Sequence, residues 1–525
     1  MACLTGVAES PHLVVNGDGR SSLQAIREKR AADGRLVAGV AAVADCEAFK
    51  VSVAHFSSES LSRGPCVLKQ ASGLMATPGL ISLGGGLPSS EYFPYQSISM
   101  QVPTLGRESR GGHGSATETV AVGKHDVADG TSEYDLSIAL NYCQATGSPQ
   151  MTRFITEHTE LVYDPPYADW QVCQTVGSTG ALEQAIRLLC DRGRGDTVLT
   201  DEYTFPTAVE TIRPQGISVV GVRMDEQGIL PDDMDSLLTS WDAGARGSRK
   251  PHVIYLIPTG QNPTGATQGA GRRRAVYDVC RKHDIFIIED EPYYFIQMPP
   301  YRGVGKDEPA TDGAEESIDD FLRGLVPTYL SLDVDGRVMR MDSFSKVLAP
   351  GSRMGWITAS KQVVDMFKLH AEVANQGPGG LAQVVLWKLL DETWGHEGYL
   401  RWLINLKNSY TKRRDTLLSA CDEFLPAEFA SWTPPEAGMF LWIKIDHTKH
   451  PGYPQRSLLD IEEEIWKTAL DSGILCARGS WFRADPDTPP RDIFFRTTFA
   501  AASQDAIRTA TERLGKAIRK SFSKE

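Results

Sequence analysis

Short apolar runs alternate with amphipathic stretches along the chain from about residue 170 onward. Between residues 175 and 197, apolar residues recur at helical spacing, which predicts a helix with one buried face. These residues are Leu182, Ala185, Ile186 and Leu189. The apolar runs themselves predict strands at residues 170–175, 197–200, 217–224, 252–257 and 285–288. Regular alternation of strands and helices predicts an α/β protein, in which a mostly parallel sheet is flanked by helices.

The same patterns divide the chain into four parts. Residues 1–75 form an extension without a readable pattern, and residues 76–140 form an N-terminal arm. The arm contains a stretch near 104–130 that is rich in Gly, Ser, Thr and charge, which is typical of a flexible insertion. Residues 141–375 form the large domain. Residues 376–525 form most of a smaller α+β domain, to which the N-terminal part also contributes.

Polar or aromatic residues follow four of the predicted strands and the apolar-rich strand that precedes Lys346. In open α/β sheets, ligands bind beyond the carboxyl ends of the strands. The residues at these ends are Ser178, Phe205, Asn262, Asp290 and Lys346. We therefore expect them to converge on one site. Ser178 or Thr179 would also cap the helix that follows, and the free N–H groups of such a helix end attract anions.

Lys346 has the most distinctive surroundings of the five. It follows an apolar-rich strand, Ser343 and Ser345 precede it, and Arg353 comes shortly after it. Poor solvation and a nearby cation both disfavour an ammonium and leave an amine able to attack a carbonyl. Hydroxyls and a guanidinium are phosphate ligands. The stretch suggests pyridoxal 5'-phosphate (PLP) held as a Schiff base to Lys346; the alternative is a surface turn with an ordinary lysine.

Composition narrows the classes of function. The chain has 525 residues and a formal net charge of -13, which argues against a nucleic-acid partner. No apolar run is long enough to cross a membrane. The nine cysteines are scattered, which argues against a metal site or a disulfide framework. These features predict a cytoplasmic protein in a reducing compartment.

Four ordered motifs carry a resemblance to a known family. They are Asn262-Pro263-Thr264-Gly265, Asp290-Glu291-Pro292-Tyr293-Tyr294-Phe295, Ser343-Phe344-Ser345-Lys346 and Arg353. From about residue 81 onward the chain resembles the class I/II, fold-type I, PLP-dependent aminotransferases. Within them it resembles the branch of fungal aromatic-amino-acid and kynurenine/2-aminoadipate aminotransferases.

The resemblance implies a role for each candidate residue in binding PLP. Lys346 would hold the cofactor and then act as the catalytic base, while Asp290 would pair with the pyridine nitrogen. Tyr293 and Asn262 would hydrogen-bond the phenolic oxygen, and Phe205 would stack on the ring. The phosphate would be bound by Ser178, Thr179, Ser343, Ser345 and Arg353.

The resemblance also implies a substrate site that two subunits share. Tyr142 would reach the phosphate from the neighbouring subunit of a homodimer. Arg496, at the end of a predicted strand, would clamp the substrate α-carboxylate together with Asn262, and Gly86 would lie against the same group. Two departures from relatives stand out. Phe205 replaces a tyrosine, and Ala477-Arg478-Gly479-Ser480 stands where many relatives have a Pro-Gly turn.

The implied activity is a ping-pong transamination, in which an aromatic L-amino acid gives its amino group to a 2-oxo acid such as 2-oxoglutarate. Alternative donors are 2-aminoadipate, kynurenine or a precursor of a secondary metabolite. Another PLP reaction, such as decarboxylation or elimination, is a rival on the same scaffold. A PLP-sensing transcription regulator is a second rival, although the first residues lack a basic recognition helix.

Overall fold

The computed structural model describes residues 53–69, 78–79, 81, 83–84, 86–105, 116–303 and 316–523. Most of the predicted N-terminal extension therefore lies outside the described residues. Among the described residues, no helix combines the length and the apolar character that crossing a membrane requires.

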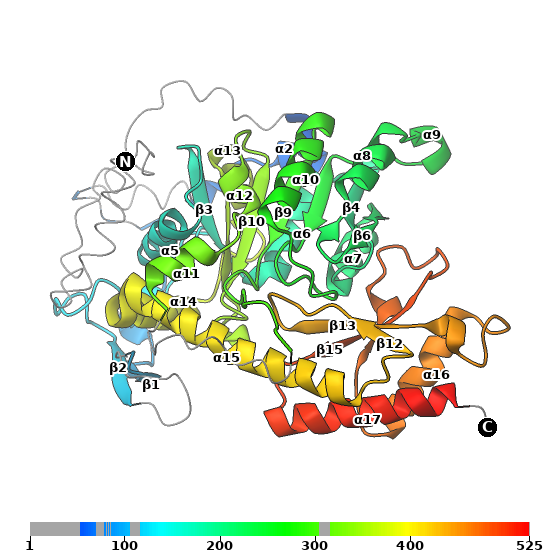
Figure 1. Cartoon of the computed structure of the whole chain (residues 1–525). Coiled ribbons are helices and arrows are strands. Elements are labelled where there is room, and N and C mark those ends of the chain that lie inside the picture. Colours follow the sequence, from blue (N-terminus) through cyan, green and yellow to red (C-terminus); the bar gives the residue numbers. More distant parts are fainter. Residues whose placement is uncertain are drawn as a thin grey trace.

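The large sheet has seven strands, and all but one run in the same direction (Figure 1). Strand β11 is antiparallel to both of its neighbours, β3 and β10, and the remaining pairs are parallel. The strands in spatial order are β3 (Trp170–Thr175), β11 (Gly355–Ser360), β10 (Val338–Ser343), β9 (Phe286–Asp290), β8 (Val253–Leu256), β4 (Thr197–Asp201) and β5 (Ser218–Val222). The prediction of a mostly parallel sheet is confirmed, because the carboxyl ends of six strands share one edge.

Helices cover both faces of this sheet because successive strand residues point to opposite sides. In β8, Val253 and Tyr255 join one hydrophobic cluster, whereas Ile254 and Leu256 join the other. The first cluster is covered by α6 (Gly177–Leu189), α7 (Pro206–Ile212) and α13 (Lys361–Ala371). The second is covered by α5 (Pro149–Val162), α8 (Pro231–Thr239), α10 (Ala270–His283) and α12 (Tyr329–Leu332). The predicted apolar face of α6 is fully buried.

A smaller antiparallel sheet lies beneath the large one in Figure 1. Its order is β12 (Ala430–Trp432), β13 (Phe440–Ile445), β15 (Ile493–Thr498) and β14 (Ala477–Arg478). It packs with α15 (Gly395–Phe424), α16 (Leu458–Asp471) and α17 (Gln504–Phe522). Helix α15 runs from the large sheet to the smaller one. The domain boundary expected at residue 375 stays a prediction.

The N-terminal part departs from two predictions. Residues Thr117–Gly123, inside the predicted flexible insertion, form strand β2, which pairs with β1 (Ser97–Pro103). This hairpin packs near the π-helical turn η8 (Lys388–Trp394) and does not join the smaller sheet. The described strands of that sheet all come from the C-terminal part. The strict polar-apolar alternation of residues 97–102 was a usable signal for β1, whereas β2 begins with three polar residues and gives a weaker one.

Residues 53–69, the described end of the predicted extension, are bound to the large domain. Phe56 is 1% exposed within the first hydrophobic cluster. Ser57 caps helix α2 (Ser58–Ser62), and its hydroxyl donates to the carbonyl of Arg187 on α6 at 2.6 Å. Residues 53–69 therefore pack against the large domain, although their sequence has no readable pattern.

Candidate active site

The predicted strand-end residues gather at the edge where the six parallel strands end. Asp290 is the last residue of β9, and Lys346 lies in the turn after β10. Ser178, Phe205 and Asn262 lie in the segments that follow β3, β4 and β8. The structure thus carries five residues that are far apart in the sequence to one edge of the sheet, where electrostatic contacts link Ser178 and Lys346 to Asp290.

Asp290 is a buried carboxylate with one free oxygen. It is 5% exposed, and its Oδ2 accepts a hydrogen bond from the hydroxyl of Tyr255 at 2.8 Å. Its Oδ1 is buried without a hydrogen-bond partner among the described residues. Burial raises the pKa of Asp290 to about 6, although the hydroxyls of Tyr255 and Ser178 act in the opposite direction. Such an oxygen fits a cationic hydrogen-bond donor, which a protonated pyridine nitrogen is.

Lys346 is half-buried close to other cations. Burial lowers the pKa of Lys346, the charges of Arg353 and Arg496 lower it further, and Asp290 raises it. A lowered pKa increases the fraction of neutral amine, which is the nucleophilic and basic form. The prediction that Lys346 lies in a positive, poorly solvated environment is confirmed.

The candidate phosphate ligands lie around the turn after β10 and the start of α6. The hydroxyl of Ser343 donates to that of Ser345 at 2.9 Å, and the Ser345 N–H donates back at 3.1 Å. The Arg353 guanidinium reaches across to the start of α6, where its Nη2 lies 3.4 Å from the Val176 carbonyl. A Cβ at Gly177 would lie 2.6 Å from the same Nη2, so only glycine permits this approach.

The start of α6 differs in detail from the prediction. Val176 occupies the N-cap position and makes no side-chain cap, so the prediction that Ser178 or Thr179 caps this helix is wrong. Both residues lie within the first turn, where Thr179 is exposed. The hydroxyl of Ser178 is buried without a hydrogen-bond partner among the residues described. It lies close enough to Asp290 to lower the pKa of that carboxyl.

Arg496 meets the large sheet through Asn262. Its Nη1 donates to the Asn262 Oδ1 at 2.7 Å. Tyr293 belongs to the same group, because the charge of Arg496 and the side chain of Asn262 both lower its pKa, although burial raises that pKa by more. Arg496 lies within β15, opposite Trp442, so its predicted place at a strand end is wrong. Because Arg496 lies in mid-strand, neighbouring strands hold its backbone on both sides.

Three predicted site residues have environments of other kinds. Phe205 is partly buried at the start of α7, against the first hydrophobic cluster. Tyr142 is 67% exposed, as a residue that serves another subunit would be. Gly86 is exposed, with no described atom within 4 Å of a Cβ built there. The assignments of Tyr142 and Gly86 remain predictions.

Sequence reasoning missed three residues that touch this group. Tyr255 donates to Asp290, and the rings of Phe440 and Phe482 lie 4.4 Å and 4.7 Å from the Arg496 guanidinium. A tyrosine within the apolar run of β8 was a usable signal, because a buried hydroxyl needs a partner. The two phenylalanines gave no signal, since they come from separate strands and turns of the smaller sheet.

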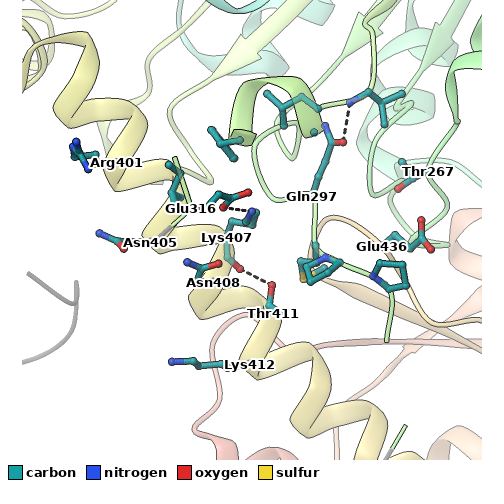
Figure 2. A pocket seen from close by; sticks show the side chains of 18 of the residues that line it. Thr267, Gln297, Glu316, Arg401, Asn405, Lys407, Asn408, Thr411, Lys412 and Glu436 are labelled. Atoms are coloured by element: carbon teal, nitrogen blue, oxygen red, sulfur yellow. Dashed lines mark hydrogen bonds and ion pairs between the residues drawn. The ribbon is translucent and has the colours of Figure 1, made fainter. Parts of the chain in front are cut away.

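A separate cavity of about 730 Å³ opens between α15, α11 (Ile318–Gly324) and the segment after β9 (Figure 2). Some of its polar groups have partners within the chain. Lys407 forms an ion pair with Glu316, and the hydroxyl of Thr411 donates to the Lys407 carbonyl at 2.9 Å. None of the predicted site residues lines it in the part of the chain that is described. The chemistry therefore belongs to the sheet edge and not to this cavity.

Comparison with known proteins agrees with this geometry. Residues 127–514 match the family model for aminotransferase class I and II. An aromatic amino acid aminotransferase of Schizosaccharomyces pombe is 40% identical over 89% of this chain and 98% of its own length. An L-tyrosine:2-oxoglutarate aminotransferase of Serpula lacrymans is 32% identical over 83% of this chain and 84% of its own.

A solved structure gives the same result. The crystal structure of the aminotransferase Aro8 from Candida albicans matches with a TM-score of 0.82 and 41% identity, over 89% of this chain and 98% of that one. The matched region includes the strands of both sheets and the turns that carry Asn262, Asp290, Lys346 and Arg496. This chain therefore belongs to the class I and II aminotransferase family and is a transaminase.

Proposed function

We propose that this enzyme transfers the amino group of an aromatic L-amino acid to 2-oxoglutarate with PLP as its cofactor. The observation that carries the proposal is the pairing of Asp290, buried with one unpartnered oxygen, with the half-buried Lys346. The two relatives named above act on aromatic amino acids by name, and one of them uses 2-oxoglutarate. Their similarity over most of their length supports the same substrates here.

Several described residues fit the cofactor. Bound PLP would supply an electron sink for the pair left at the substrate Cα when its proton is removed. Asp290 would hold the ring nitrogen protonated, and Tyr293 and Asn262 would hydrogen-bond the phenolic oxygen. Ser343, Ser345 and Arg353, with the start of α6, would bind the phosphate, since hydroxyls and a guanidinium are its usual partners.

Lys346 would hold the cofactor and then move the proton. Its lowered pKa supports this role, because a neutral amine can accept the proton at the substrate Cα. The same amine would then donate that proton to the cofactor carbon that retains the amino group. The surrounding burial excludes water, which would compete for the proton.

Arg496 would orient the substrate through its α-carboxylate. The guanidinium is partly buried, and one of its N–H groups is already fixed by Asn262 at 2.7 Å. The remaining N–H groups are available for a bidentate contact with a carboxylate. The amino acid that donates the amino group and the 2-oxo acid that accepts it both carry an α-carboxylate. One arginine therefore serves both halves of a ping-pong reaction.

We also propose that the active enzyme is a homodimer in the cytoplasm. Exposed apolar or aromatic residues at the end of the N-terminal extension and along the N-terminal arm support a second copy as partner. They are Val67, Leu68, Ile81, Leu83 and Tyr92. The free state of the seven described cysteines supports a reducing compartment. Tyr142→Phe should weaken PLP retention without changing the mass measured by light scattering.

The decisive experiment is an absorbance spectrum of the purified protein with PLP, before and after L-tyrosine or L-phenylalanine. We expect a visible cofactor band that disappears with the amino acid and returns with 2-oxoglutarate. A band that responds only to kynurenine or 2-aminoadipate would redirect the donor assignment. Release of ammonia or carbon dioxide without a requirement for an oxo acid would overturn transamination by this route.

A further inference from the structure

The turn after β14 departs from the Pro-Gly pattern of relatives and leads directly to the substrate arginine. Strand β14 ends at Arg478, and a 3-10 turn covers Gly479–Phe482. The ring of Phe482 lies 4.7 Å from the guanidinium of Arg496, a distance typical of a cation–π contact. The position of this turn therefore bears on the orientation of Arg496.

Glu462, on helix α16, binds the beginning of this turn through hydrogen bonds. Its carboxylate is 3% exposed, and both of its oxygens accept hydrogen bonds from the turn. The Ser480 N–H donates to Oε1 at 2.9 Å. Arg478 Nε and the Ser480 hydroxyl donate to Oε2 at 2.9 Å and 2.5 Å. One buried carboxylate thus binds three donors from two residues of the turn.

The far end of the turn is tied to the large sheet. The Phe482 carbonyl accepts a hydrogen bond from the Thr204 N–H at 2.7 Å, next to Phe205. At the first residue of the turn, a Cβ at Gly479 would lie 2.8 Å from the Phe494 carbonyl oxygen, so the turn passes close to β15. Phe482 is therefore held between the Glu462 contacts and the Thr204 contact. Without a proline, hydrogen bonds supply the rigidity that a Pro-Gly turn gains from its ring.

We propose that Glu462 is a positioning residue for the substrate α-carboxylate. It fixes Arg478 and Ser480, which places Phe482 against Arg496 and limits the orientations of the guanidinium. This inference rests on the proposed role of Arg496. Because donor and acceptor share that arginine, loss of Glu462 should weaken the binding of both. The groups that bind the cofactor are not touched by Glu462, so kcat and the cofactor band should stay nearly unchanged.

The test is Glu462→Gln, with Glu464→Gln as the matched control. Glu464 lies on the same helix but pairs with Arg456 and His450, away from the turn. In Glu462→Gln we expect KM for the amino acid and for 2-oxoglutarate to rise together by about tenfold, as after loss of one charge-assisted hydrogen bond. Glu464→Gln should keep both KM values. Glu462→Asp, which keeps the charge, should recover part of the loss.

Arg478→Met is the second variant, in case Glu462→Gln folds poorly. It should raise both KM values, and the double variant should show less than the product of the two effects, because the residues act through one contact. Unchanged KM values, a rise for one substrate only, or an equal fall in kcat would overturn the proposal. Arg496→Lys is measured alongside. If it raises both KM values while Glu462→Gln does not, only the Glu462 inference fails, whereas unchanged values in Arg496→Lys overturn both.

Discussion

Two buried aspartates on neighbouring strands have opposite surroundings. Asp342, on β10, accepts two hydrogen bonds from the Arg340 guanidinium at 2.8 Å each and one from the Tyr163 hydroxyl at 2.9 Å. Asp290, on β9, has only the neutral Tyr255 hydroxyl and one oxygen without a partner. Asp342 belongs to a network in which charge is matched inside the chain. Asp290 belongs to a site where a bound ligand would supply the compensating positive charge.

The network extends below the site through two more ion pairs. Arg340 also lies 3.4 Å from the Glu289 carboxylate, and Arg273 lies 3.0 Å from that of Glu291. All four side chains are fully buried. Burying a charge is costly unless a partner compensates it. Buried atoms without a hydrogen-bond partner among the described residues also occur within this network, at Arg340 Nη1 and Glu291 Oε2. The comparison therefore teaches that a buried carboxylate to which no described arginine hydrogen-bonds, and not burial alone, distinguishes the candidate ligand site.

The largest expected effect separates activity from stability. Lys346→Ala should lower transaminase turnover by at least about a hundredfold, because the proton at the substrate Cα loses its base. It should also abolish the visible band of the bound cofactor. The free energy of unfolding should change little, since Lys346 is only half-buried. Spectra, turnover and urea unfolding test this, with the exposed Lys361→Ala as control. Turnover like that of the parent enzyme would remove Lys346 from the mechanism.

The next effect concerns the paired aspartate. Asp342→Asn should reduce the free energy of unfolding at pH 7 by about 3–5 kcal/mol, because the buried Arg340 loses its nearer counter-charge and keeps only the longer contact with Glu289. Denaturant unfolding of the cofactor-free protein measures this. A loss below about 1 kcal/mol would mean that the network tolerates the loss of this partner of Arg340. The contrast with Asp290 would then be wrong.

Burial raises the pKa of Asp342 as well, but no described arginine hydrogen-bonds to Asp290, so Asp290→Asn should have the opposite effect on stability. Burial raises the pKa of Asp290 to about 6, above its value in an unfolded chain. The folded protein therefore holds this proton more tightly, and stability is lost as pH rises from about 4 through about 6. Asp290→Asn removes that cost, so the cofactor-free variant should gain up to about 3 kcal/mol above pH 6.

The control for Asp290→Asn is the pH dependence itself. At about pH 4 the parent and the variant should differ by only about 0.5 kcal/mol, because Asp290 is then protonated in the folded state and about half ionised in the unfolded chain. Unfolding curves at acid and neutral pH test this, and PLP retention should fall in the variant. An equal gain at both pH values would show that ionisation of Asp290 is not the cause.

The smallest effect compares two hydroxyls. Tyr163→Phe removes a donor to Asp342 and should cost about 1–2 kcal/mol of unfolding free energy. Ser178→Ala removes a buried hydroxyl without a hydrogen-bond partner among the described residues, so it should change stability by less than about 0.5 kcal/mol. Calorimetry of the cofactor-free proteins measures both. Equal costs would mean that Ser178 is bound within the chain after all.

The sequence by itself determined the class of fold and most of the site. Short apolar runs located the five strands, because a strand that is buried on both faces is apolar throughout. A period of 3.6 located the apolar face of α6, because helix geometry imposes that period. The turns after the strands could be recognised since their Pro, Gly and polar residues are local features. The direction of parallel strands then predicted that Asp290, Asn262 and Lys346 would meet.

Only the tertiary structure decided which polar groups are paired. Asp290 and Asp342 look alike in the sequence, and their difference arises from Arg340, Tyr163 and Tyr255, which packing brings near them. The same holds for Glu462, whose partners Arg478 and Ser480 lie on another element, and for the hairpin of β1 and β2. Pairing depends on distances between segments far apart along the chain, and local sequence patterns carry no information on those distances.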